Sequence, residues 1–180
     1  MKTPISRGTC TRRESTATST HSETSCLTVT PCRIVWIAYC GAMNPADVLP
    51  HRPPFLFVDE ILEIVPGESA RGRWRLTGDE WFFAGHFPGR PTLPGVLMCE
   101  AIAQVGAFAV LRDERFRGKL PLFGGIDSAR FRRQVGPGDE LILECEMGRM
   151  SARAGKGSGR ALLDGQVATE CDLMFVVVSV

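Results

Sequence analysis

His86 and Glu100 are the residues of this sequence whose types and setting could support acid–base chemistry. Both lie in the stretch GHFPGRPTLPGVLMCEAIAQ, residues 85–104, which begins rich in glycine and proline and ends apolar. A carboxylate in an apolar run is costly to bury unless it is paired or protonated. Glu100 could turn outward or meet an arginine, but the run offers no polar face to turn to. Burial favours the protonated carboxyl group, which suits an acid that donates a proton.

The residues before Glu100 supply two further groups that the same chemistry needs. A loop histidine is often structural, but imidazole also exchanges protons near neutral pH, so His86 is a candidate base. Gly95 follows Pro94 at the start of the apolar run, where free N–H groups of a first helical turn can stabilise an oxyanion. A base, an acid and an oxyanion donor suit proton removal beside a thioester carbonyl, with loss of a hydroxyl group from the next carbon. The spacing alone supports only a candidate acid–base site.

One long helix and about five or six strands must position these groups. The run GVLMCEAIAQVGAFAVL, residues 95–111, contains no proline and follows one, which predicts a helix of about four to five turns. Apolar residues surround this helix, so it should be buried on all sides. Strands are predicted at 69–76, 120–127, 128–135, 139–147, 159–163 and 166–178, with a turn at 136–139 and a two-residue hairpin at 164–165. These elements predict an α+β fold in which a curved antiparallel sheet wraps the helix.

The composition fits a globular protein with no global electrostatic partner. The chain has 180 residues, 44% of them hydrophobic, and a net charge of +1. Such a balance indicates neither nucleic acid nor a membrane surface as partner. The seven cysteines form no CxxC pair and the three histidines lie far apart, so we expect no metal site and no disulfide framework. We therefore expect reduced cysteines and a cytoplasmic protein.

Residues 1–42 differ from the rest of the chain. They are rich in serine and threonine, have few acids and show no apolar periodicity, so they cannot fold alone. The apolar run at 34–42 is too short to span a bilayer. The segment could be a targeting peptide, a disordered tail or an upstream translation artefact before Met43. We favour the artefact, because residues 43–180 have the pattern of a compact domain.

Three stretches closely resemble the β-hydroxyacyl-acyl carrier protein dehydratases of bacterial type II fatty-acid synthesis: LPHRPPFLFVD, GHFPGRPTLPGVLMCEAIAQ and LFGGIDSARFRRQVGPGDEL. The resemblance is collinear over about residues 44–178 and is to the form with glutamate on the central helix. It implies a hot-dog fold, with a long central helix wrapped by a curved antiparallel β-sheet. It also implies a homodimer, often assembled into a hexamer, no cofactor, and an active site shared between the two chains.

The resemblance implies a role for each site residue. His86 would take the α-proton of a (3R)-hydroxyacyl thioester, Glu100 of the other chain would protonate the departing hydroxyl, and the Gly95 N–H would polarise the thioester carbonyl. The product would be the trans-2-enoyl thioester. His51 and Arg52 match the family's PHR motif and should be structural near the site mouth. Candidates for lining the acyl tunnel are Phe83, Phe87, Val96 and Phe123. A basic cluster for the acidic acyl carrier protein would comprise Lys119, Arg130, Arg132 and Arg133.

Other activities remain open on the sequence. A hot-dog acyl thioesterase would use the helix carboxylate but would not need His86. An isomerising dehydratase typically carries aspartate where this chain has Glu100. A carrier-binding subunit without activity would not need either residue. The stretch LPLF lacks the tyrosine that often gates the family's tunnel, so a tyrosine gate is not expected.

Overall fold

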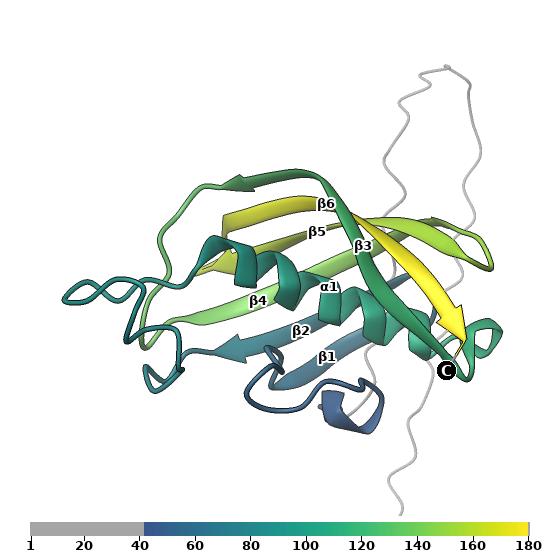
Figure 1. Ribbon diagram of the computed structural model, residues 1–180, viewed down its shortest axis with the longest axis horizontal. Coiled ribbons are helices and arrows are strands. Elements are labelled where there is room, and N and C mark those ends of the chain that lie inside the picture. Colours follow the sequence, from purple (N-terminus) through teal and green to yellow (C-terminus); the bar gives the residue numbers. More distant parts are fainter. Residues whose placement is uncertain (1–41, 180) are drawn as a thin grey trace, which may run out of the picture. The chain divides into compact units, whose positions relative to one another are not determined.

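The computed structural model describes residues 42–179, which form one long helix against one sheet (Figure 1). The expectations for residues 1–41, and for the four cysteines within them, lie outside the described residues. In chain order the elements are η1 (Pro45–Asp47), β1 (Glu60–Val65), β2 (Ser69–Arg75), α1 (Gly95–Leu111), η2 (Glu114–Phe116), β3 (Lys119–Phe131), β4 (Glu140–Met150), β5 (Ala154–Leu163) and β6 (Gln166–Ser179).

The six strands form one antiparallel sheet in the order β1-β2-β4-β5-β6-β3. The sheet curves around α1, which lies across one of its faces (Figure 1). This arrangement confirms the predicted α+β hot-dog fold. The chain enters the sheet at one edge with β1 and, after the helix, returns at the opposite edge with β3.

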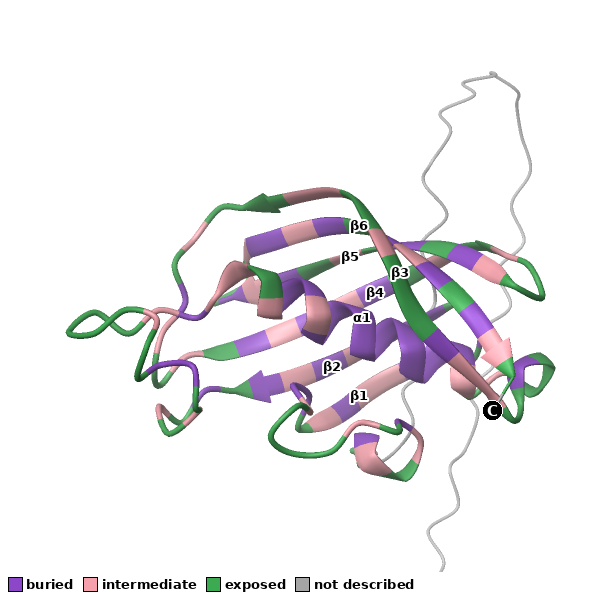
Figure 2. Cartoon of the chain, viewed as in Figure 1, coloured by how far each residue is buried: buried purple, intermediate pink, exposed green. Residues whose placement is uncertain are grey.

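Helix α1 covers the predicted residues, with Pro94 directly before its first residue. Its central and last turns are buried without interruption from Ala101 to Val110 (Figure 2). The prediction of burial on all sides is wrong for the first turn, where Val96 is 64% exposed. That turn faces a cleft rather than the sheet.

Two strand predictions needed correction. β3 runs unbroken over residues 119–131, so the strands expected at 120–127 and 128–135 are one. β1 was not predicted. Apolar and polar residues do not alternate in its sequence, EILEIV, and buried and exposed positions do not alternate in the structure. The register of β1 against β2 shifts between Ile61 and Glu63, which places Leu62 in an irregularity.

The tight hairpin between β5 and β6 is confirmed. Asp164 and Gly165 have φ angles of 51° and 74°, the left-handed pair that a type I′ turn requires. The turn at 136–139 is also present, with the Asp139 N–H bonded to the Gly136 carbonyl at 3.2 Å.

The cysteines of the described residues are free and buried: Cys99, Cys145 and Cys171. Burial raises the pKa of the Cys145 thiol to about 12, which keeps it protonated. Among residues 42–179, no helix combines the length and the apolar character that crossing a bilayer requires.

Candidate active site

His86 lies in the loop between β2 and α1, with its imidazole held in one orientation. Its Nδ1 bonds the Thr92 carbonyl at 2.9 Å, and the Thr92 N–H bonds the His86 carbonyl at 2.9 Å. A carbonyl oxygen can only accept, so in the neutral ring Nδ1 carries the hydrogen and Nε2 has the free lone pair. Phe87 stacks on the imidazole, with ring centroids 4.0 Å apart. The ring is therefore oriented so that Nε2 can accept a proton.

Gly95 and His86 line the same cleft of about 460 Å³. Gly95 is the first residue of α1, and its N–H makes no hydrogen bond to another described backbone group. A Cβ built on Gly95 would lie 2.7 Å from the Phe131 ring, so a larger residue does not fit without movement. The remaining lining comes from Thr92, Leu93, Pro94, Val96, Met98, Phe131, Arg132, Arg133 and Gln134. A free helical N–H and a histidine thus share one opening.

Glu100 lines a separate and narrow cleft of about 30 Å³, with Phe123 and Phe175 among its walls. The Glu100 side chain is 18% exposed. Its Oε1 accepts a hydrogen bond of 2.9 Å from Nε2 of Gln104, one helical turn further on. No hydrogen bond among the described residues involves Oε2.

Gln104 is the site residue that the sequence analysis missed. Its side chain is 1% exposed, and its Oε1 accepts from the Phe57 N–H at 2.9 Å. Its Nε2 donates to the Phe55 carbonyl at 3.3 Å as well as to Glu100. One buried amide therefore connects Glu100 to the segment before β1. The signal was a single uncharged polar residue, four positions after Glu100, in an otherwise apolar helix.

The PHR motif lies closer to the carboxylate than expected. His51 Nε2 is 3.8 Å from Glu100 Oε1, and its buried Nδ1 has no partner within residues 42–179. Arg52 fixes the turn that carries this histidine, because its Nη1 donates to the Leu49 and His51 carbonyls at 2.7 and 2.6 Å. His51 is thus a neighbour of Glu100.

Within one chain, His86 and Glu100 line different clefts. Both clefts are bordered by β3: the one at His86 by Phe131, and the one at Glu100 by Pro121 and Phe123. The edge strand is therefore the structural element that borders both clefts.

Two of the four tunnel candidates lie in these clefts, and the other two, Phe83 and Phe87, line a third cleft of about 560 Å³. Val96 lies in the His86 cleft, and Phe87, which stacks on the His86 ring, is 56% exposed. Phe123 lies in the Glu100 cleft and is 38% exposed. Phe83 is 5% exposed and packs on Phe82 at 4.7 Å, so it belongs to the core.

The expected basic cluster forms without Lys119. Arg130 and Arg132 both bond Oε1 of Glu170, and Nη1 of Arg133 donates to the Leu163 carbonyl at 2.9 Å. Lys119 begins β3 and Arg130 is near its end, which in an extended strand corresponds to roughly 30 Å or more. Lys119 lies instead over the Phe116 ring.

Comparison with known proteins identifies the family of the chain. A family model described as a FabA-like domain matches residues 49–172. The 3-hydroxyacyl-[acyl-carrier-protein] dehydratase FabZ of Moorella thermoacetica is 54% identical over 130 residues, which are 72% of this chain and 91% of the relative. The FabZ of Herpetosiphon aurantiacus is also 54% identical, over 131 residues that are 73% of this chain and 93% of the relative. The chain belongs to the FabZ dehydratase family.

A solved structure supports the fold of this FabZ family member. The dehydratase heterocomplex ApeI:P from Xenorhabdus doucetiae matches with a TM-score of 0.64 at 14% identity, covering 76% of this chain and 92% of that chain. At this identity the likeness concerns the fold alone.

Proposed function

We propose that the protein dehydrates (3R)-hydroxyacyl-acyl carrier protein to the trans-2-enoyl thioester in fatty-acid synthesis. His86 of one subunit takes the α-proton, and Glu100 of a second subunit protonates the departing hydroxyl group. The observation that carries this proposal is that two half-sites of complementary chemistry border the same sheet edge in a member of the FabZ dehydratase family.

The His86 cleft supports the first half of the reaction. The bond from Nδ1 to the Thr92 carbonyl leaves Nε2 as the acceptor for a proton. The free N–H of Gly95 in the same cleft suits a thioester oxygen, on which negative charge grows as the α-proton leaves. The α-carbon would then lie between the base and the oxyanion donor.

The Glu100 cleft supports the second half. Gln104 holds Oε1, so Oε2 is the oxygen left to deliver a proton to the hydroxyl. Microscopic reversibility then lets the same carboxylate and imidazole catalyse hydration of the enoyl product.

The edge strand β3 supports the dimer. An edge strand offers unpaired backbone groups, and soluble proteins usually protect such edges with charges or a covering segment. β3 instead exposes apolar side chains along the length that separates the two clefts. These residues and one neighbour on β6 are Leu122, Phe123, Ile126, Phe131 and Val176. Pairing of two β3 edges would cover them and bring the half-sites of two chains together.

Subunit complementation tests the shared site. The variants His86→Ala and Glu100→Gln should each lose about a hundredfold or more of the dehydration rate, measured by the ultraviolet absorbance of the enoyl thioester. Co-expression of the two variants should recover about a quarter of the wild-type rate, because half of the random dimers contain one intact site. Failure of the mixture to recover, with dimers formed, would place both residues in one chain's site. Release of free acid instead of enoyl product would favour a thioesterase.

A further inference from the structure

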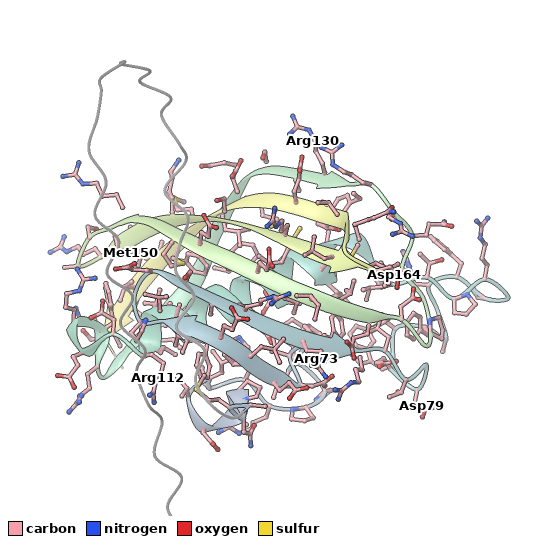
Figure 3. The ribbon with its side chains drawn as sticks, turned by 180° about the vertical axis from the view of Figure 1, so that it is seen from behind. Arg73, Asp79, Arg112, Arg130, Met150 and Asp164 are labelled. Carbon is pink, nitrogen blue, oxygen red and sulfur yellow. The ribbon has the colours of Figure 1, made fainter. Side chains whose placement is uncertain are left out.

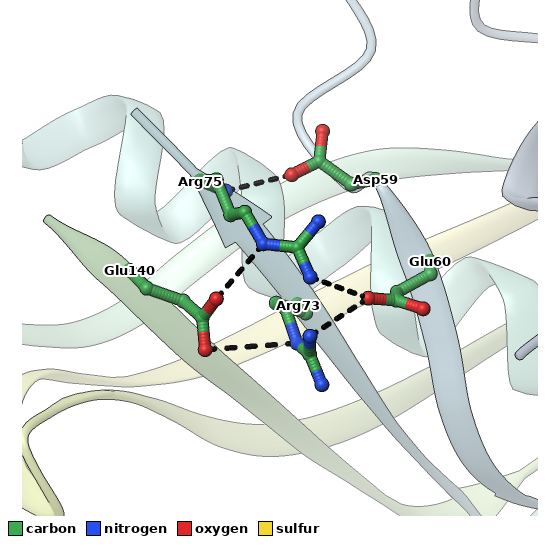
Figure 4. A network of polar contacts seen from close by, with 5 residues as sticks. All are labelled: Asp59, Glu60, Arg73, Arg75 and Glu140. Carbon is green, nitrogen blue, oxygen red and sulfur yellow. Dashed lines mark hydrogen bonds and ion pairs between the residues drawn. The ribbon is translucent and has the colours of Figure 1, made fainter. Parts of the chain in front are cut away.

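Two sets of charges differ in their balance, one on the sheet face away from α1 (Figure 3) and one at the β3 edge. Over β1, β2, β4 and β5, four arginines and four glutamates form two ion-pair networks, together called the lattice here, one of which is shown in Figure 4. Its members are Arg71, Arg73, Arg75, Arg160, Glu60, Glu63, Glu140 and Glu144, so its net charge is zero.

The second set lies at the β3 edge and is not balanced. Arg130, Arg132 and Arg133 have a single carboxylate within ion-pair distance among the described residues, that of Glu170. The net charge of this group is therefore +2. Arg132 and Arg133 also line the His86 cleft, so the surplus positive charge stands at its mouth.

Glu170 restrains both exposed arginines with one oxygen atom. It stands on β6 directly across from Arg130 of β3. Its Oε1 accepts from Nη1 of Arg130 at 3.5 Å and from Nη2 of Arg132 at 2.5 Å. The arginine side chains are 66% and 50% exposed, which leaves their remaining N–H groups open to a partner.

We propose that Glu170 is an electrostatic restraint on docking of the acidic carrier protein, competing with the carboxylates of the carrier for Arg130 and Arg132. This inference rests on the proposed function, since it concerns how the carrier reaches the His86 cleft. A weaker hold on the carrier before the reaction also permits faster release of the enoyl-carrier product. Rim charges of this kind act on association rate and salt dependence more than on chemistry.

The Glu170 carboxylate is ionised under ordinary conditions. Its hydrogen bond from Arg132 lowers its pKa below the usual range of a glutamate. A glutamine at this position would keep an oxygen that accepts from both guanidinium groups but would remove the negative charge. The local net charge would rise from +2 to +3 while the arginines stay in place.

The experiment measures kcat and KM of the intact protein for a 3-hydroxyacyl group on two carriers, acyl carrier protein and N-acetylcysteamine. Glu170→Gln should lower KM for the protein-borne substrate about threefold or more at low salt, with kcat equal to or below the wild-type value. Its KM should also rise more steeply with salt, and the kinetics with N-acetylcysteamine thioester should not change. Glu63→Gln is the matched control, because it removes the same charge at the opposite edge, where Arg71 keeps Glu144.

The outcomes distinguish an error in the Glu170 restraint from an error in the proposed dehydratase function. An unchanged or higher KM of Glu170→Gln for the protein-borne substrate overturns the restraint, while turnover of the small thioester by the same sample upholds the dehydratase. An equal fall in KM for Glu63→Gln overturns it too, because the effect would then reflect net charge alone. Absence of turnover of both substrates by the wild-type protein would instead overturn the proposed function.

Discussion

The two edges of the sheet are built from different residues, although both are strands with one unpaired side. At the β1 edge, Met43 makes two backbone hydrogen bonds with Ile61, of 3.0 and 2.9 Å, and no β1 residue is fully exposed. Glu60 and Glu63 of this strand are paired with arginines of β2. At the β3 edge, nothing within residues 42–179 covers the strand, and its side chains are largely exposed.

The difference separates an edge that is protected from one that is exposed. The β1 edge follows the usual means of preventing edge-to-edge association, which are charge and a covering segment. The β3 edge has apolar side chains, a surplus of arginine and both candidate half-sites along it. In the proposed dimer, catalysis depends on the β3 side meeting a second copy, whereas the β1 side needs no partner.

The largest effect is expected from a charge placed in the middle of the β3 edge, where it would test the difference between the two edges. Ile126 is 44% exposed, and in the proposed dimer Ile126→Glu would place a carboxylate in an apolar interface. We expect a folded monomer in analytical ultracentrifugation and a loss of about a hundredfold or more in dehydration rate, equal to the loss of a catalytic group.

Leu62→Glu provides the control at the other edge. Leu62 is partly exposed and is not among the residues that pack against the core. This variant should remain dimeric and active. A monomeric Ile126→Glu protein with full activity would show that one chain holds a complete site.

The second prediction concerns the end of β3 that meets the helix. Gly95→Ala would place a methyl group 2.7 Å from the Phe131 ring. Overpacking of this kind costs about 1–3 kcal/mol of the free energy of unfolding. We expect a lower melting temperature and about a tenfold or greater loss of kcat, since the N–H that faces the thioester in the proposed mechanism moves.

Phe131→Ala should restore the melting temperature of Gly95→Ala, because it removes the atoms that clash. Thermal unfolding of the two single variants and the double variant measures this coupling directly. Additive destabilisation by the two substitutions would contradict the contact.

The third prediction concerns the side-chain amide of Gln104, which connects Glu100 to the segment before β1. Gln104→Leu would leave the buried Phe57 N–H without an acceptor, which costs about 1–3 kcal/mol in unfolding experiments. It would also release Glu100 Oε1, so we expect kcat to fall about tenfold with little change in KM. In a Glu100→Gln background the same substitution should not reduce the residual rate further. A further fall there would mean that Gln104 acts on something other than the carboxylate.

The sequence was sufficient to predict the elements that are determined by residues close together in the chain. Pro94 and an uninterrupted apolar run predicted α1, and Asp164-Gly165 predicted the hairpin of β5 and β6. β1 was missed because a register shift at Leu62 breaks the alternation by which strands are recognised. Lys119 was misplaced because residues 120–127 and 128–135 were expected to form two separate strands. A continuous β3 keeps Lys119 and Arg130 at opposite ends.

The same distinction between local and distant contacts applies to the candidate site residues. His86, Gly95 and Glu100 could be chosen from the sequence, because each is unusual among its neighbours in the chain. Gln104 could not be assigned a role, since its partners Phe55 and Phe57 are 49 and 47 residues away. The contact of Phe131 with Gly95 likewise depends on where β3 ends against the helix.

The smallest effect is expected in the lattice on the β1 side (Figure 4). Glu140 accepts from Nε of Arg75 at 2.9 Å and lies 3.6 Å from Nε of Arg73, but both arginines also pair with Glu60. Glu140 is 45% exposed, and exposed pairs contribute at most about 1 kcal/mol. Glu140→Gln should therefore change the free energy of urea unfolding by less than about 1 kcal/mol. Dimerisation and KM should stay at wild-type values. A large change in either would mean that the β1 side takes part in assembly or carrier docking, and the contrast between the two edges would fail.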